Sequence, residues 1–144
     1  MRAPISKFAA SAALAIVVFA APPVEAQTRA DNRAACRSTD PDTAIGGCSR
    51  DIASGEEKTP ADLAVAYYDR AMAYDDEDLV DKAVSDYTKA IELNPNDSNY
   101  YDNRGADYFS SGRVNDAIAD FRAALKVNPN DPIASKNLAA ATAP

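Results

Sequence analysis

Two cysteines are the residues of this sequence with the clearest potential for chemistry. Cys36 and Cys48 have eleven residues between them. A catalytic redox pair favours the spacing C-x-x-C, and a zinc site needs more ligands than two cysteines. In an oxidising compartment an isolated pair most often forms a structural disulfide. We therefore predict a Cys36–Cys48 disulfide, with a redox pair or a metal site as the alternatives.

The other potentially reactive side chains are carboxylates and hydroxyls. The densest acidic run is "DDED" (75–78), but a calcium loop alternates its oxygen ligands around a glycine, and this run has neither feature. The run indicates a solvated turn. The sequence has no histidine, no glycine-rich phosphate loop and no nucleophile-elbow motif. The serines have no evident base, so we expect no enzyme, no metal site and no cofactor.

The first 26 residues have the three parts of a secretory signal peptide. "MRAPISK" is basic, "FAASAALAIVVFAA" (8–21) is apolar and uncharged, and "VEA" (24–26) places small or aliphatic residues where a signal peptidase cleaves. The rival interpretation is a membrane anchor, but a spanning helix needs about 20 apolar residues. A lipid anchor needs a cysteine directly after the apolar run, and Cys36 lies well beyond it. We predict cleavage after Ala26 and export to the periplasm or the extracellular space.

The chain is acidic, with 15 Lys and Arg residues against 22 Asp and Glu residues and a formal net charge of −7. Nucleic acids and anionic membrane surfaces are also negative, so this charge disfavours both as partners. It permits a basic partner. Once the signal peptide is removed, we expect no stable membrane insertion.

Residues 64–131 contain a gapless repeat. "AVAYYDRAMAYDDEDLVDKAVSDYTKAIELNPND" (64–97) aligns with "SNYYDNRGADYFSSGRVNDAIADFRAALKVNPND" (98–131). Matching small and aromatic residues recur at i, i+4 and i+7, which places them on one face of a helix. "DDED" and "SSGR" indicate the turn between two helices. Asn94-Pro95 and Asn128-Pro129 end the second helix, since the residue before a proline is pushed out of the helical region.

Each unit is therefore predicted to be a helical hairpin, which cannot bury its apolar face alone and stacks on its neighbours. Small residues would let helices approach closely, and aromatic residues would fill the space between them. The predicted packing residues are Tyr67, Ala71, Tyr74, Ala83, Tyr87, Ala90, Pro95, Tyr101, Gly105, Tyr108, Ala117, Phe121, Ala124 and Pro129.

With these residues at this period, the segments 64–97 and 98–131 resemble two tetratricopeptide repeats. The resemblance implies an all-α fold, a right-handed stack of antiparallel helical hairpins. One departure is that Arg70 and Arg104 stand where the family usually has a bulky aliphatic residue. Two interpretations are open. The arginines pair with repeated acids such as Asp86 and Asp120, within or between units, or they lie on the solvated rim.

The flanking segments are predicted to complete the array. "DPDTAIGGCSRDIASG" (40–55) resembles the second helix of a unit, with Cys48 in place of Tyr87, and "RADNRAACRS" would be a shortened first helix. Residues 27–63 are therefore predicted to be a degenerate, disulfide-stapled hairpin and loop. Thr59-Pro60 and Asp131-Pro132 are signals for a helix cap and first turn. Residues 132–144 are predicted to be a capping helix and tail, with Ile133 and Leu138 covering the last hairpin.

The resemblance also implies a function, because the family binds peptides or protein segments in a concave groove lined by the first helix of each unit. Exposed aromatic and methionine side chains would anchor a partner, and aspartates would make the groove acidic. The alternative is that Tyr68 and Phe109 pack against the N-terminal hairpin or its loop. The groove residues that the resemblance implies are Val65, Tyr68, Met72, Asp75, Asn99, Asp102, Ala106 and Phe109.

Some family members clamp a C-terminal carboxylate with lysine, arginine and asparagine. Only Asn103 fits that pattern here, so a basic or apolar segment is the expected partner. The sequence thus predicts a non-enzymatic protein-interaction module. The alternative is a self-associating structural subunit of an envelope assembly, which would complete its short array as a homodimer.

Overall fold

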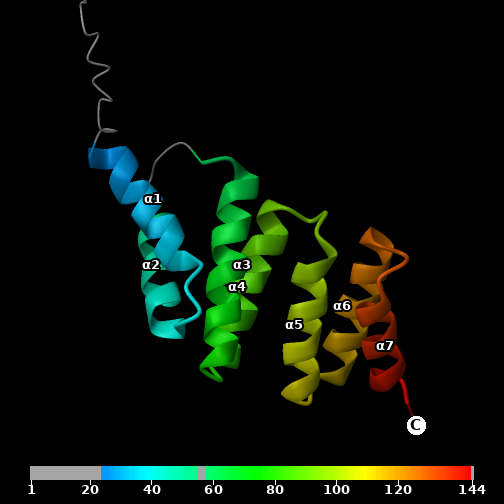
Figure 1. Cartoon of the computed structure of the whole chain (residues 1–144). Coiled ribbons are helices and arrows are strands. Elements are labelled where there is room, and N and C mark those ends of the chain that lie inside the picture. The colour runs from blue at the N-terminus through cyan, green and yellow to red at the C-terminus, as the bar shows by residue number, and fades with distance from the viewer. Residues whose placement is uncertain (1–23, 55–57, 144) are drawn as a thin grey trace, which may run out of the picture.

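The computed structural model describes residues 24–54 and 58–143. In these ranges the chain is all-α and has no strand, which confirms the predicted fold class (Figure 1). Residues 1–23 of the predicted signal peptide, and residues 55–57 of the predicted loop, lie outside the described residues. The helices are α1 (Val24–Cys36), α2 (Pro41–Ala53), α3 (Pro60–Asp76), α4 (Val80–Leu93), α5 (Ser98–Ser110), α6 (Val114–Val127) and α7 (Pro132–Ala141).

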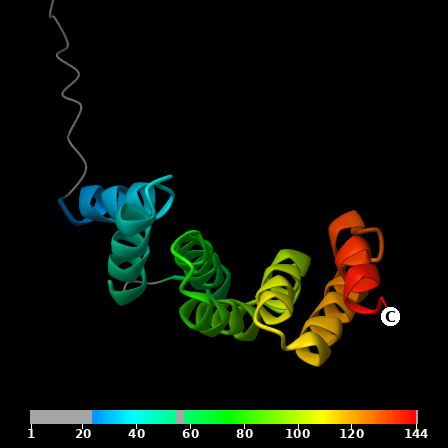
Figure 2. The same ribbon diagram turned by 90° about the horizontal axis from the view of Figure 1, so that it is seen from below.

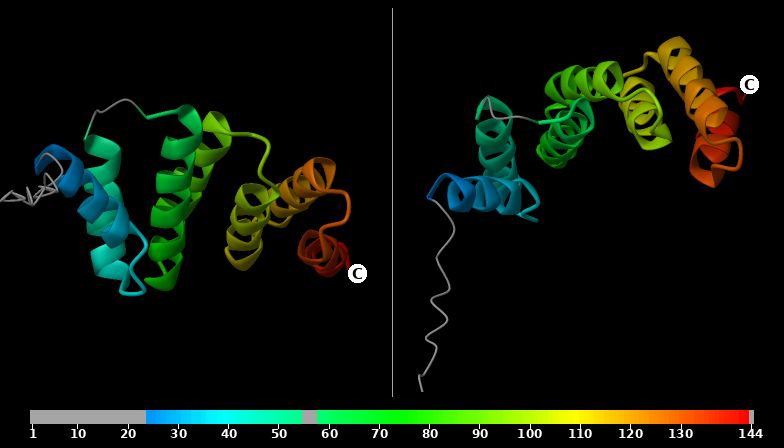
Figure 3. Two further views of the ribbon diagram at one scale, coloured as in Figure 1. Left: turned by 45° about the horizontal axis from the view of Figure 1, so that its top comes forward. Right: turned by 90° about the horizontal axis from the view of Figure 1, so that it is seen from above.

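The helices form two rows along a curved stack. Figure 2 shows α1, α3, α5 and α7 on the inner side of the curve, with α2, α4 and α6 on the outer side. The helix axes turn along the stack, so that α5 to α7 are seen more nearly end-on than α2 and α3 in the left view of Figure 3. The first helix of every hairpin therefore contributes to one concave face.

The helix ends follow the local sequence signals. The predicted cap at Thr59 is part of a capping box with Asp62, and Asp131 accepts hydrogen bonds from the backbone of Ile133 and Ala134. Helices α4 and α6 end directly before Asn94 and Asn128. The prediction that "DDED" is wholly a turn is wrong, because α3 continues through Asp76.

The predicted small residues and two large rings form the core. Ala71, Ala83, Ala90, Ala117 and Ala124 are fully buried, as are the side chains of Tyr87 and Phe121. A Cβ added to Gly105 would lie 2.7 Å from Cε1 of Phe121, so this position has no room for a side chain. Pro95 and Pro129 are exposed, so their role is to end helices and the prediction that they pack is wrong.

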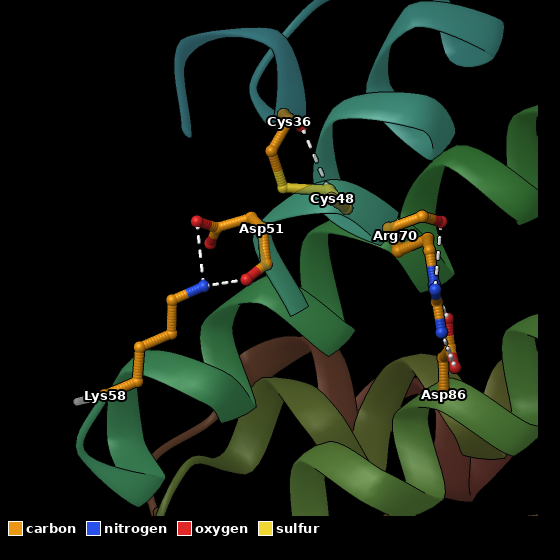
Figure 4. Close-up of a disulfide and its surroundings, with 7 residues drawn as sticks. Cys36, Cys48, Asp51, Lys58, Arg70 and Asp86 are labelled. Atoms are coloured by element: carbon orange, nitrogen blue, oxygen red, sulfur yellow. Dashed lines mark hydrogen bonds and ion pairs between the residues drawn. A yellow bond between two sulfur atoms is a disulfide. The ribbon is translucent and has the colours of Figure 1, made fainter. Parts of the chain in front are cut away.

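Two arginines join neighbouring hairpins. Nε and Nη2 of Arg70 donate to the two carboxylate oxygens of Asp86 at 2.6 and 2.9 Å (Figure 4), and Nη1 donates to Ser49 of the preceding hairpin at 3.0 Å. The predicted pairing with Asp86 is confirmed, and it lies within one unit. The link to the preceding hairpin is the hydrogen bond that Arg70 donates to the Ser49 hydroxyl.

The second repeat has the same bridge. Arg104 donates to both oxygens of Asp120 at 2.8 and 2.9 Å and to the Thr88 hydroxyl at 2.9 Å. The predicted packing tyrosines are half-buried beside these arginines: the guanidinium carbon of Arg70 lies 5.5 Å from the Tyr67 ring centre and 5.8 Å from that of Tyr74. The guanidinium carbon of Arg104 lies 5.6 Å from the ring centre of Tyr108. Tyr101 is also half-buried.

The N-terminal hairpin has the predicted disulfide between Cys36 and Cys48 (Figure 4). Cys48 is fully buried at the position that Tyr87 occupies in the first repeat. A Cβ on Gly47 would lie 2.4 Å from the backbone nitrogen of Cys36, so α1 and α2 touch at their backbones. Lys58 closes this end of the hairpin with an ion pair to Asp51 at 2.8 Å.

Helix α7 covers the last hairpin, but not with both predicted residues. Leu138 packs against the cluster of Ala117, Phe121 and Ala141, as predicted. Ile133 is 60% exposed, so its predicted packing role is wrong. The buried residue near the start of α7 is Ala134, which lies one position further along the helix.

Candidate partner-binding groove

The residues predicted to line the groove differ widely in exposure. Val65, Met72 and Phe109 are 40%, 45% and 42% exposed, so three apolar side chains of α3 and α5 reach solvent. Asn99 and Ala106 are also exposed. The remaining three predicted groove residues, Tyr68, Asp75 and Asp102, have partners inside the protein.

Tyr68 lies between the two repeats. Its ring centre is 5.0 Å from that of Tyr100 and 5.8 Å from that of Tyr87, and its hydroxyl accepts a hydrogen bond from Asn103 at 3.0 Å. Burial raises the pKa of its hydroxyl. The packing alternative therefore describes Tyr68 in part, since the side chain is half-buried and its ring and hydrogen-bond contacts are with α4 and α5.

Asp102 is buried and does not present free negative charge to the groove. Its Oδ1 accepts a hydrogen bond from Nδ2 of Asn137 on α7 at 3.1 Å, and burial raises the pKa of the carboxyl group. Asn103 on α5 and Asn137 on α7 occupy equivalent positions of the repeat period, and each donates to the first helix of the preceding repeat. The recurrence of asparagine at the repeat period was the sequence signal for these contacts.

The concave face is hollowed between α1 and α3. Two cavities of about 260 and 100 Å³ lie there and share Cys36, Arg37 and Asp69 in their walls. Met72 lines the larger cavity and Val65 the smaller one. Two of the predicted groove residues thus border neighbouring cavities, which together form a depression that extends to α1, beyond the predicted groove residues.

This depression has walls of opposite charge. Arg33 of α1 and Arg37, directly after α1, line one side, and Asp62, Asp69 and Asp76 line the other from α3. Burial raises the pKa of Asp69, and the nearby Arg37 opposes that rise. The helical spacing of the two arginines, four residues apart, and of the three aspartates, seven residues apart, was the signal that could have found these walls.

The depression offers binding contacts but no evident reactive group. In the described ranges 24–54 and 58–143, no group of three or more carboxylate or cysteine side chains is placed to hold a metal ion. Within the same residues, no helix combines the length and apolarity needed to cross a membrane. Apolar side chains and charged side chains of both signs thus line the same depression.

Together, the stacked hairpins and the concave face define a helical solenoid of the kind that binds other proteins. A tetratricopeptide repeat model matches residues 64–97, and a second model, described as TPR repeat, matches residues 105–143. The chain therefore belongs to the tetratricopeptide repeat family. A search of curated protein sequences finds no match.

Solved structures with the same fold include peptide-binding domains. The chain is similar to the Arabidopsis OM64 TPR domain, with 23% identity over 83% of this chain and 94% of that one, at a TM-score of 0.69. It is 25% identical to the second TPR domain of human RPAP3 in complex with the HSP70 peptide SGPTIEEVD, over 84% of this chain and 98% of that one, at a TM-score of 0.69. These similarities support a protein-interaction module.

Proposed function

We propose that this protein is an exported, non-enzymatic adaptor that holds a segment of another protein in the depression between α1 and α3. The observation that carries the proposal is the pair of neighbouring cavities that share Cys36, Arg37 and Asp69 in their walls, with Met72 lining one and Val65 the other. Exposed apolar side chains within a rimmed depression supply the desolvated contacts that dominate binding energy.

The charges of the walls indicate the chemistry of the partner segment. A segment with basic side chains toward α3 and acidic side chains toward α1 would meet opposite charge on both sides, which fixes its orientation. This differs from the uniformly acidic groove expected from the sequence. An uncharged apolar stretch would contact Val65 and Met72 between the walls.

The test is a pull-down with the exported chain from an extract of its own compartment. Met72→Asp places a charge on the floor of the depression, and Val127→Asp is the matched control on α6, where Val127 is also partly exposed. We expect one protein to be retained by the wild type and the control and lost from Met72→Asp, with all three chains equally helical by circular dichroism. Equal retention by both variants would overturn the groove assignment.

A self-associating subunit is the second candidate, because Ile133 is 60% exposed on the last helix of the stack. In that case the outer face of α7 would pair with a second copy. Light scattering over a concentration series distinguishes the two functions. A mass that rises toward that of a dimer, and that stays monomeric in Ile133→Asp, supports self-association; a constant monomer mass supports the adaptor.

The proposed export of the protein is tested separately. We propose cleavage after Ala26, on the pattern of basic, apolar and small residues at the start of the chain. The intact mass of the protein isolated from its native cells should lack residues 1–26 and should show no free thiol. A mass that includes the apolar run 8–21 would instead support a retained anchor.

A further inference from the structure

The carboxyl groups of Asp75 and Asp107 lie within hydrogen-bonding reach of each other, between the first helices of the two repeats. Asp75 lies in the last turn of α3 and Asp107 lies near the end of α5. The Tyr87 hydroxyl donates to Oδ2 of Asp75 at 2.6 Å. Oδ1 of Asp75 and Oδ2 of Asp107 are closed to solvent, and no donor among the described residues reaches either oxygen.

The surroundings supply no compensating positive charge. Asp76 of α3 adds a further carboxylate near Asp75, and α4 contributes only the Tyr87 hydroxyl. Arg104 of α5 is engaged by Asp120 of α6, and Asn137 of α7 bonds Asp102. In the ranges that the structure describes, no lysine or arginine forms an ion pair with either carboxyl group.

Burial and the neighbouring carboxylate of Asp75 raise the pKa of Asp107 to about 7. Burial also raises the pKa of Asp75. Two buried oxygens without donors cannot accept a hydrated metal ion or the ammonium of a partner, because neither oxygen is open to solvent. A single proton fits between the two groups and gives each carboxyl a partner.

We propose that Asp75 and Asp107 share one proton and form a pH-sensitive joint between the groove helices α3 and α5. When the proton leaves to solvent, two carboxylates face each other in a buried contact and repel. The other side-chain contacts between these helices include the tilted ring pair of Tyr68 and Tyr100 and the hydrogen bond that Asn103 donates to Tyr68. The curvature of the concave face would therefore respond to pH near neutrality.

The sign of the effect on stability follows from linkage. The folded state holds the shared proton more tightly than the unfolded chain, in which an aspartate has its ordinary pKa near 4. The stabilising contribution is therefore complete below pH 4. It decreases as the pH rises from about 4 to about 7, and it is absent above that range.

The experiment is urea unfolding of the exported chain at several values between about pH 5 and about pH 8. We expect the equilibrium constant for unfolding to increase by about tenfold or more over this range in the wild type. Asp107→Asn should remove most of the increase, because its amide can donate to Asp75 in place of the proton. Asp102→Asn is the matched control at the next contact between first helices, where Asn137 already supplies a donor. Because burial also raises the pKa of Asp102, this variant should lose part of the increase, but less than Asp107→Asn.

An equal slope in Asp107→Asn and wild type would overturn the proposal. Because a variant can fail to fold, carboxyl carbon-13 NMR of the wild type gives a second test. A titration of Asp107 near neutral pH supports the shared proton. A titration of Asp107 below about pH 5 contradicts it, because an ordinary exposed aspartate titrates there.

Discussion

The N-terminal hairpin and the last repeat fill the same packing position with different chemistry. In α5–α6 this position is the ring of Phe121, which is fully buried beside Gly105. In α1–α2 it is Cys48, which is bonded to Cys36. The residue before it is Asp120 in the repeat, where it binds Arg104, and Gly47 in the hairpin, where it touches the backbone of α1.

In the N-terminal hairpin, a disulfide and a close backbone contact therefore take the place of the buried ring and the ion pair of the last repeat. A hairpin with a cysteine and a glycine at these positions buries less apolar area than one with phenylalanine and aspartate, so it gains less from the hydrophobic effect. The disulfide offsets that deficit by restricting the unfolded chain. The two regions should therefore fail under different conditions, which the following experiments separate.

The largest expected effect is in the repeat. Phe121→Ala removes a fully buried ring from the cluster with Ala117 and Ala141, so we expect a loss of about 4 kcal/mol in the free energy of unfolding. Urea unfolding measures it. Phe109→Ala is the matched control, since that ring is 42% exposed, and it should lose about 1 kcal/mol or less. Similar losses in both variants would contradict the packing account.

The next effect concerns the arginine bridge of the repeats, for which the N-terminal hairpin has Gly47 at the position of the acidic partner Asp120. Arg104→Met leaves the buried Asp120 without its cation, so we expect a loss of about 3 kcal/mol. Adding Asp120→Asn removes the uncompensated charge and should restore part of that loss. A double-mutant cycle measures the coupling of the pair. Additive losses in the cycle would show that the pair does not stabilise the repeat.

The smallest effect is the loss of the disulfide. Cys36→Ala with Cys48→Ala should lower stability by about 2–3 kcal/mol, the range for a short closed loop. Hydrogen exchange should show faster exchange in α1 and α2, with unchanged protection in α5 and α6. Loss of protection along the whole stack would mean that the disulfide supports the array and not one hairpin.

Much of the fold follows from the sequence because its repeat is gapless. The period places Ala71, Ala83 and Tyr87 on helix faces, and the proline-containing caps mark where helices start and end. The prediction is less accurate for helix ends that have no such signal. "DDED" contains no glycine or proline, and α3 continues through half of it. Ile133 was assigned to the interface by its hydrophobicity alone, although it lies on the exposed side of α7.

The candidate site was less predictable, because the spacing of residues along one helix does not reveal which neighbouring helix they face. Tyr68 on α3 and Asp102 on α5 both belong to predicted groove stripes. Each accepts a hydrogen bond from an asparagine two helices further along the chain, Asn103 on α5 and Asn137 on α7. The depression beside α1 depends on how the degenerate hairpin stacks on α3. That arrangement is a tertiary property, which periodicity does not determine.

The most direct test of the binding account is site-specific photocrosslinking in the native cells. A photoreactive residue replaces Met72 on the floor of the depression, and a second strain carries it at Val127 on α6 as the control. The account predicts a crosslinked partner of one defined mass at position 72 and none at position 127. A crosslink at 127 alone, or adducts of this chain only with itself, would contradict the account of a partner-binding groove.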